Sequence, residues 1–168
     1  MGYVIYKLSN MDGYRTFYKR YKDKLFAYLM RMTGDYYLSS DIMQESFTRH
    51  LEHYGEQTPS ISLLYTIARN ALFDSARKQR YNTEPTEYPD DYSSNQENII
   101  LVREEYRQVL LAMQRLKKDE RDIIALAISG ELSYKEIASI AGISEANVKV
   151  KIHRARLKLR NILQRGNI

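Results

Sequence analysis

The chain has 168 residues, with 26 Lys or Arg against 21 Asp or Glu, a formal charge of +5 and a sequence pI of about 9.3. It contains no cysteine, which excludes disulfides and thiolate metal sites and is compatible with a reducing cytosol. No apolar run approaches the ~20 residues of a membrane span, and the N-terminus lacks the pattern of a signal peptide. We therefore expect a cytoplasmic protein without membrane insertion, whose positive balance suits a polyanionic partner.

The charges divide the chain into three parts. Residues 1–80 carry 12 basic and 8 acidic side chains, and residues 99–168 carry 14 basic and 8 acidic ones. Residues 81–98 between them hold five acids and no base, together with two prolines, several Asn and Ser, and no apolar periodicity. This layout predicts two small domains, 1–80 and 99–168, joined by a flexible acidic linker.

The N-terminal part has apolar residues at helical spacing, which predicts three helices that can enclose one small core. Asp12 is the expected cap of the first helix, and Gly34 breaks it. The second helix is expected from near Ser39 or Ser40 to Gly55, and the third from about Ser60 to Arg80. The expected apolar stripe of the second helix is Met43, Phe47, Leu51 and Tyr54.

The C-terminal part resumes a helical pattern at Glu97, with a stripe that continues to Leu116. Asp119 is the expected cap of a shorter helix that contains Ile123, Ile124, Ala127 and Ile128, and Gly130 is expected to end it. We find no convincing strand in the sequence. It therefore predicts an all-α fold, with three helices in the first domain and four in the second.

The stretch from Ser133 to Arg165 has the pattern of a helix-turn-helix. Ser133 and Glu136 have the spacing of a capping box, and Gly142 can take the positive φ of a tight turn. Ser144 is the expected cap of the second helix. The apolar face of that helix is Val148, Ile152, Ala155, Leu159 and Ile162.

The other face of this last helix is basic, and no acid occurs between Asn147 and Arg165. A positive second helix fits the major groove of DNA, although a solvated surface helix is the simpler alternative. The unbroken positive run favours DNA binding. Its cations are Lys149, Lys151, Arg154, Arg156, Lys158, Arg160 and Arg165.

Three motifs in this order resemble the extracytoplasmic-function class of bacterial RNA polymerase sigma factors. D-I-M-Q-E-S-F (41–47) is similar to the family's stretch that docks on the polymerase clamp. L-L-Y-T-I-A-R-N-A-L-F-D (63–74) is similar to its helix that opens and reads the −10 element. Residues 132–156, from L-S-Y-K-E-I-A to K-I-H-R-A-R, are similar to its −35 reader. The resemblance covers about residues 11–80 and 99–164.

The resemblance implies a role for each motif. An amphipathic helix with acidic and amide groups would suit the basic clamp, and the polymerase-binding residues are expected to be Asp41, Ile42, Gln44, Glu45 and Thr48. In the −10 helix, Asn70 is expected to read a base that has left the stack, with Asp74 one turn later and cations on the DNA backbone. The expected −10 residues are Leu63, Arg69, Asn70, Asp74, Arg77, Lys78 and Arg80.

In the −35 reader, Lys149, His153 and Arg154 are expected to face base edges. Lys151, Arg156 and Lys158 are expected at phosphates or in solvent, and Tyr134 and Lys135 at the DNA backbone. Ser144, Glu145, Asn147 and Val150 complete the expected set.

Three positions depart from the family's pattern and leave the promoter sequence open. Leu63 stands where many relatives have Trp, and Lys149 stands where Arg is common and so lacks a bidentate fork. Val150 replaces a small polar residue and could contact a thymine methyl group.

The resulting hypothesis is that the chain is an alternative sigma factor that binds core RNA polymerase and promoter DNA. An anti-sigma factor is expected to hold it inactive, so the protein is expected as a monomer or as a heterodimer with that factor. The alternative is a stand-alone helix-turn-helix regulator, which should dimerise on a two-fold site. We expect no enzyme activity, cofactor or metal. His50 and His53 are three residues apart and could share a metal, but no third ligand is evident.

Overall fold

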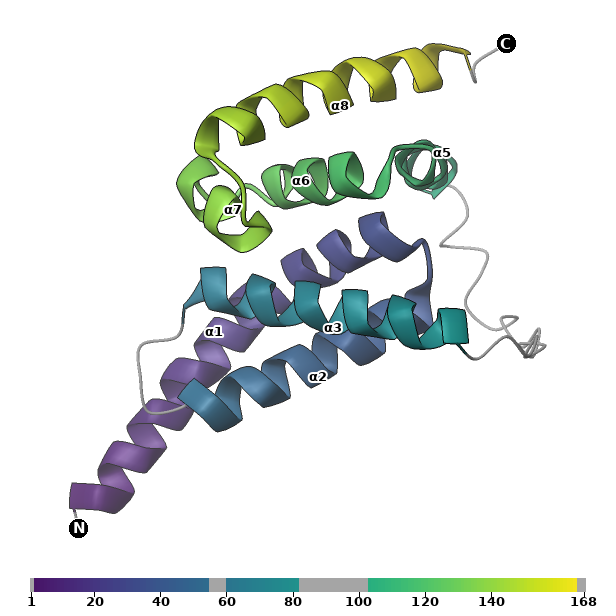
Figure 1. The fold of residues 1–168 in the computed structure, drawn as a ribbon. Helices are drawn as coiled ribbons and strands as arrows, with labels where there is room; N and C mark the ends of the chain where they lie inside the picture. Colours follow the sequence, from purple (N-terminus) through teal and green to yellow (C-terminus); the bar gives the residue numbers. More distant parts are fainter. Residues whose placement is uncertain (1, 55–59, 82–102, 166–168) are drawn as a thin grey trace.

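A computed structural model of the chain describes residues 2–54, 60–81 and 103–165, with side chains for 12–52, 60–78 and 104–165 (Figure 1). Every regular element in these ranges is an α-helix, and they contain no strand. The all-α prediction is therefore confirmed. Nearly all of the predicted linker, 81–98, lies outside the described residues, so its flexibility stays a prediction.

Three helices form the N-terminal half: α1 (Gly2–Thr33), α2 (Tyr36–Tyr54) and α3 (Ile61–Tyr81). Gly34 has φ +70°, which confirms the break after α1. The Asp35 carboxylate accepts a hydrogen bond from the Leu38 amide at 3.0 Å, so α2 begins before the expected Ser39. The predicted cap at Asp12 is wrong. The helix continues through it because no proline interrupts residues 2–33 and an interior Asp costs a helix little.

Four helices form the C-terminal half: α5 (Arg103–Gln114), α6 (Lys118–Ile128), α7 (Tyr134–Ala141) and α8 (Glu145–Arg165). The predicted cap at Asp119 is also wrong, because α6 begins at Lys118 and its N-cap, Lys117, makes no side-chain capping bond. Asp119 instead lies in the first turn, where a negative charge suits the helix dipole. Gly130 has φ +71° just after α6, as predicted for the end of this helix.

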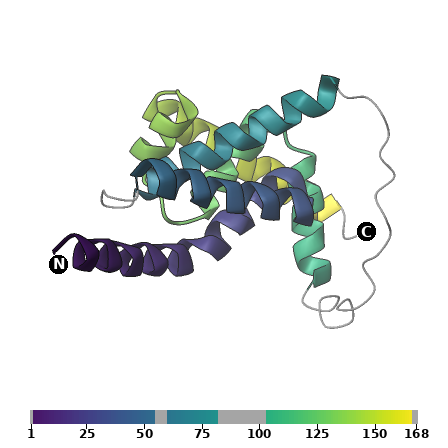
Figure 2. The same ribbon diagram turned by 90° about the horizontal axis from the view of Figure 1, so that it is seen from below.

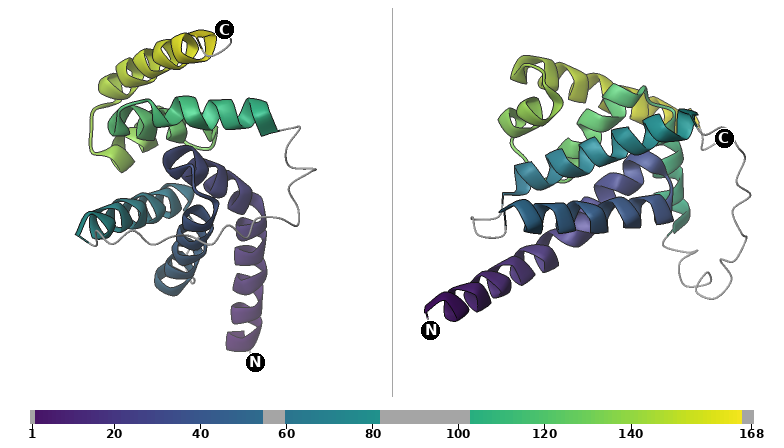
Figure 3. Two further views of the ribbon diagram at one scale, coloured as in Figure 1. Left: turned by 90° about the vertical axis from the view of Figure 1, so that its right-hand side faces the viewer. Right: turned by 60° about the horizontal axis from the view of Figure 1, so that its bottom comes forward.

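The two halves lie one on the other as two layers of helices (Figures 1 and 3). α1 contacts α5 and α6, and α3 contacts α7. The first turns of α1 extend away from the body of the molecule (Figure 2). Buried side chains from both halves form a single apolar cluster, which includes Leu25, Leu29 and Leu64 from one layer and Ile124 and Ile137 from the other.

Two buried polar side chains change the orientation expected for their helices. His50 is buried in α2, while the neighbouring Leu51, expected in the apolar stripe, is 45% exposed. His50 stacks on Phe17 with ring centroids 5.3 Å apart, and its Nε2 lies 3.2 Å from the Ser60 carbonyl oxygen. In α6, Asp122 is buried, while Ile128 is exposed. Both helices therefore turn a polar residue inward, which an apolar stripe alone cannot predict.

Candidate nucleic-acid interface

Local contacts fix the geometry of the helix-turn-helix. The capping box is confirmed: Ser133 Oγ accepts from the Glu136 amide at 3.2 Å, and Glu136 Oε2 accepts from the Ser133 amide at 2.7 Å. Gly142 ends α7 with φ +68°, and Ser144 Oγ accepts from the Asn147 amide at the start of α8. The apolar faces of α7 and α8 are buried, as predicted, at Ile137, Ile140, Val148, Ile152 and Ala155. The turn between the helices is therefore set by residues within it.

The side chains expected to read the −35 element lie mainly on the surface of this unit. Lys151 alone among them is half-buried. Two of the cations have intramolecular partners: Lys149 Nζ lies 3.2 Å from Glu145, and Lys158 Nζ lies 2.5 Å from Glu120. The Lys158 ammonium is the main cause of a lowered pKa at Glu120. The exposed members are Tyr134, Lys135, Ser144, Glu145, Asn147, Lys149, Val150, His153, Arg154, Arg156 and Lys158.

The residues expected at the −10 element lie along α3. Asn70, Asp74, Arg77 and Lys78 are exposed, and Leu63 is half-buried. Arg77 pairs with Asp74 one turn earlier at 3.2 Å. Arg80 lies in the helix, but its side chain is outside the described residues. An exposed amide flanked by cations is thus present on α3, and its role in reading DNA stays a prediction.

Arg69 differs from the other predicted DNA contacts because a buried carboxylate from the C-terminal half already binds it. Its Nε donates to Asp122 Oδ2 at 2.7 Å, and its side chain is only 20% exposed. Its guanidinium carbon lies 4.4 Å from the centroid of the Phe73 ring, in cation–π geometry. In this arrangement the Nε of Arg69 is engaged by Asp122, and little of its side chain is exposed to a phosphate.

The expected polymerase-binding surface on α2 contains four exposed side chains, Asp41, Gln44, Glu45 and Thr48. Ile42 is 3% exposed, so its prediction as a surface contact is wrong. Residues 39, 42 and 46 follow helical spacing and all face the core, which places Ile42 on the buried side. The remaining four lie on the other side of α2.

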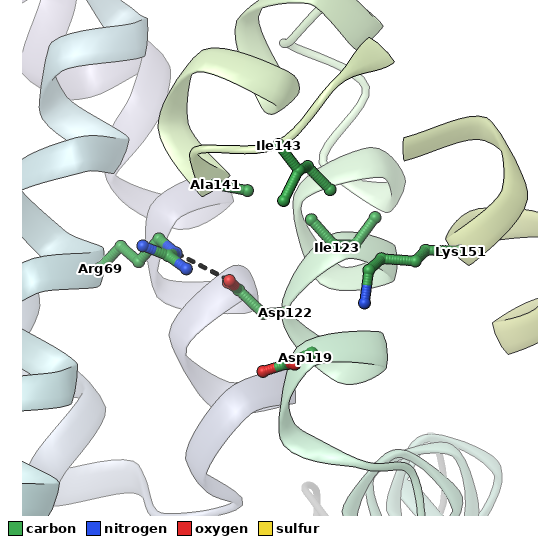
Figure 4. Close-up of a pocket in the computed structure, with 7 residues that line it drawn as sticks. All are labelled: Arg69, Asp119, Asp122, Ile123, Ala141, Ile143 and Lys151. Atoms are coloured by element: carbon green, nitrogen blue, oxygen red, sulfur yellow. Dashed lines mark hydrogen bonds and ion pairs between the residues drawn. The ribbon is translucent and has the colours of Figure 1, made fainter. Parts of the chain in front are cut away.

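Asp122 joins the two layers through hydrogen bonds to α1 and α3, of which Figure 4 draws the one from Arg69. Besides the bond from Arg69, its Oδ1 accepts from the Tyr28 hydroxyl at 2.9 Å. Burial, and next the Asp122 carboxylate, raise the pKa of Tyr28 well above its ordinary value, so the phenol remains a donor at neutral pH. Asp122 was not predicted as a functional residue; its sequence signal is one carboxylate at the head of the apolar run I-I-A-L-A-I.

Further polar contacts cross between the layers. Gln114 Nε2 donates to the Arg31 carbonyl at 3.1 Å, and Arg121 donates to the Met32 carbonyl at 2.9 Å. These carbonyls lie in the last turn of α1, where no intrahelical donor is available. Lys24 forms an ion pair with Glu131. The C-terminal half therefore caps α1.

A small hollow lies at this boundary (Figure 4). It is lined by Arg69 from α3, by Asp119, Asp122 and Ile123 from α6, by Ala141 and Ile143 around the turn, and by Lys151 from α8. Two cations expected to bind different promoter elements thus share one hollow with two carboxylates. Within the described residues, no group of three or more His, Asp or Glu side chains could hold a metal ion, and no helix has the length and apolarity to cross a membrane.

Comparison with known families matches both halves of the chain. The Sigma-70 region 2 model matches residues 17–81, which span the second half of α1 and all of α2 and α3. The Sigma-70, region 4 model matches residues 106–159, which include the helix-turn-helix. The matched ranges leave out the acidic stretch between them.

Curated relatives match nearly the whole chain. The ECF RNA polymerase sigma factor SigM of Bacillus subtilis is 33% identical over 156 residues, which are 89% of this chain and 94% of SigM. The ECF RNA polymerase sigma factor SigL of Mycobacterium tuberculosis is 30% identical over 159 residues, 89% of this chain and 88% of SigL.

Two solved structures share the fold. One is the sigma factor RpoE in complex with the anti-sigma factor NepR from Bartonella quintana, with a TM-score of 0.69 and 19% identity over 89% of this chain and 96% of that one. The other is CnrH in complex with the cytosolic domain of CnrY, with a TM-score of 0.64 and 21% identity over 95% of this chain and 96% of that one.

The fold is that of a two-domain, all-α protein with a basic helix-turn-helix. With both regions matched and relatives covering most of its length, the chain belongs to the extracytoplasmic-function (ECF) family of RNA polymerase sigma factors. This family consists of transcription initiation factors rather than classical enzymes. The match to region 2 over α1–α3 also decides against the alternative of a stand-alone helix-turn-helix regulator.

Proposed function

We propose that the two halves act on promoter DNA as separate domains, 1–80 at the −10 element and 99–168 at the −35 element, with 81–98 as the acidic linker. The observation that carries this proposal is the pair of surfaces on α3 and α8, each with exposed polar or basic side chains. At the −35 element, Lys149, His153 and Arg154 contact base edges, while Arg156 and Lys158 neutralise phosphates. Lys158 must leave Glu120 to do so, at little cost because its side chain is 48% exposed.

At the −10 element, Asn70 reads an extruded base and Arg77 and Lys78 hold the strand. Extrusion of a base costs a few kcal/mol, so the helix needs both a hydrogen bond to the base and phosphate contacts. Asn70 is exposed and has cations about two turns further along α3, which supports this assignment.

Asp41, Gln44, Glu45 and Thr48 form the polymerase-docking surface on α2. All four are exposed, and the two carboxylates among them suit a basic partner helix. The partner that restrains the free protein is an anti-sigma factor, by analogy with the RpoE–NepR complex of the same fold. Because its polymerase partner acts in the cytoplasm, we place this chain there as well.

In-vitro transcription from a library of random upstream sequences tests the assignment. Core polymerase with this protein should initiate at sites that share two spaced elements, and core polymerase alone should not. Absence of initiation by a folded protein would refute the proposal.

Single substitutions then assign each element. Lys149→Ala should change base preference in the upstream element, and Asn70→Ala in the downstream element, each by roughly 5- to 150-fold as for a good base contact of about 1–3 kcal/mol. Arg160→Ala is a matched control, since Arg160 is exposed on the same helix as Lys149 but outside the predicted contacts. If the preference of the upstream element follows Arg160 rather than Lys149, the register assigned to α8 is wrong.

A further inference from the structure

Asp122 occupies a position where an acid competes with DNA for a predicted DNA-binding cation. Its side chain is 3% exposed and comes from the helix-turn-helix half, while Arg69 comes from the −10 helix. The carboxylate accepts one charged hydrogen bond from Arg69 and one neutral bond from Tyr28. A buried carboxylate needs such partners, and here both belong to the other half of the chain.

The boundary around this acid has the composition of a separable interface. The hydrogen bonds and ion pairs that cross it use Lys24, Tyr28, Arg69, Gln114 and Arg121 as donors. Tyr28 and Tyr65 are buried there with ring centroids 5.4 Å apart, and tyrosines suit surfaces that are dry in one state and wet in another. Polar contacts of this kind are typical of interfaces between domains of one chain, and here they accompany the apolar cluster that the two halves share.

The same contact holds the two predicted promoter readers in one arrangement. Arg69 and Lys151 line a common hollow with Asp119 and Asp122, beside the turn of the helix-turn-helix (Figure 4). Phosphates of two separate promoter elements cannot both reach this one hollow. A fully extended chain between Tyr81 and Arg103 could span roughly 70 Å, so the covalent connection permits separation of the halves.

We propose that Asp122 is an intramolecular latch that stands in for DNA phosphate. In the free protein it holds Arg69 and keeps the two halves closed. When promoter DNA and polymerase bind, Arg69 exchanges the carboxylate for phosphate and the halves separate. This inference rests on the proposed function of α3. It adds that the same site is regulated by the chain itself, without a second protein.

The opening can be measured by fluorescence energy transfer within the full-length protein. The absence of native cysteine allows a clean labelled pair at Lys19→Cys and Asn161→Cys, which are exposed positions on α1 and α8. Wild-type protein should show mainly one high-transfer population. Asp122→Asn keeps the size of the side chain and removes its charge, so it should raise the open-to-closed ratio about tenfold or more.

Two further variants make the result specific. Asp119→Asn is the matched control, because Asp119 lines the same hollow but is exposed and has no hydrogen bond to Arg69. It should leave the ratio within about twofold of wild type. Tyr28→Phe removes one bond to Asp122 and keeps the ring, so it should raise the ratio less than Asp122→Asn does. If circular dichroism shows that Asp122→Asn does not fold, the open-to-closed ratio of Tyr28→Phe tests the latch instead.

Transcription separates this inference from the proposed function. Wild-type protein that initiates with core polymerase establishes the function, and Asp122→Asn should then reach half-maximal initiation at a lower protein concentration. An unchanged transfer distribution in both Asp122→Asn and Tyr28→Phe overturns the latch even if transcription succeeds. Failure of transcription alone overturns the proposed function, while the transfer measurement still reports on closure.

Discussion

The two helices proposed to contact promoter DNA, α8 and α3, are held in place by different kinds of contact. The start of α8 is set by Gly142 and Ser144, which directly precede it, and by the capping box of α7. Arg69 on α3 is held by Asp122, 53 positions further along the chain. The helix-turn-helix should therefore keep its geometry whether the halves are closed or open, whereas the environment of Arg69 should depend on closure.

This difference also affects energetics. Burial of the Arg69–Asp122 pair removes both charges from water, so the pair adds little net stability compared with a well-packed apolar contact. The pair instead favours this one arrangement of the two halves, because in the free protein any other arrangement leaves a charge without its partner. The apolar cluster that both halves build is the main source of stability.

The largest expected effect comes from removal of buried side chains on either side of the boundary. Leu25→Ala in α1 and Ile137→Ala in α7 each truncate a fully buried residue and should lower the free energy of unfolding by about 2–5 kcal/mol. Because the buried cluster is continuous, both should shift one common transition in urea followed by circular dichroism.

Leu157→Ala is the matched control for this pair, since Leu157 lies on α8 with 44% exposure and should change stability by less than about 0.5 kcal/mol. A curve for Ile137→Ala that separates into two steps would contradict a jointly unfolding molecule. It would show that the halves are stable independently.

A smaller effect tests how locally the helix-turn-helix is determined. Gly142→Ala places a side chain at φ +68°, where the added Cβ meets no atom within 4 Å, so the cost is backbone strain of about 1–2 kcal/mol. Gly13→Ala is the opposite case, because Gly13 lies inside α1 and an added Cβ meets no atom within 4 Å. This substitution should raise the free energy of unfolding by about 0.5–1 kcal/mol. Chemical denaturation of the two variants should give shifts of opposite sign, and a stabilising Gly142→Ala would refute the strain argument.

The same contrast explains what the sequence could predict. The capping box at Ser133, the turn at Gly142 and the buried face of α8 depend on residues close together in the sequence, and all were predicted and are confirmed. The start of α2 was predicted at Ser39 or Ser40, but Asp35 caps this helix. All three residues are of good N-cap types, and they lie within six positions of each other. Most of the helical architecture was therefore predictable from caps and periodicity.

Orientation within the core was less predictable. The burial of His50 and Asp122 in place of Leu51 and Ile128 depends on partners from other helices, which periodicity does not identify. Ile42 was assigned to polymerase binding through the resemblance of its motif, although its helical spacing with Ser39 and Ser46 places it on the buried side. The engagement of Arg69 follows from Asp122, so its environment could be found only from the tertiary structure.

The smallest expected effect concerns acid and comes from His50 in the N-terminal half. Burial lowers the pKa of His50, and the hydrogen bond to Ser60 only partly offsets this. The unfolded chain, with an imidazole pKa of about 6.5, then binds a proton more readily than the folded one. Stability should therefore be greatest above about pH 6.5 and fall as the pH drops from there toward the lower folded pKa.

Urea titrations between pH 5 and 8 can measure this decrease. His50→Phe keeps an aromatic ring against Phe17 and should flatten the profile in this range, since no buried imidazole then remains among the described side chains. His153→Gln alters an exposed histidine of α8 and should retain the wild-type slope. If the slope follows His153 instead, the acid sensitivity belongs to the helix-turn-helix half, and the core of α1–α3 is not its source.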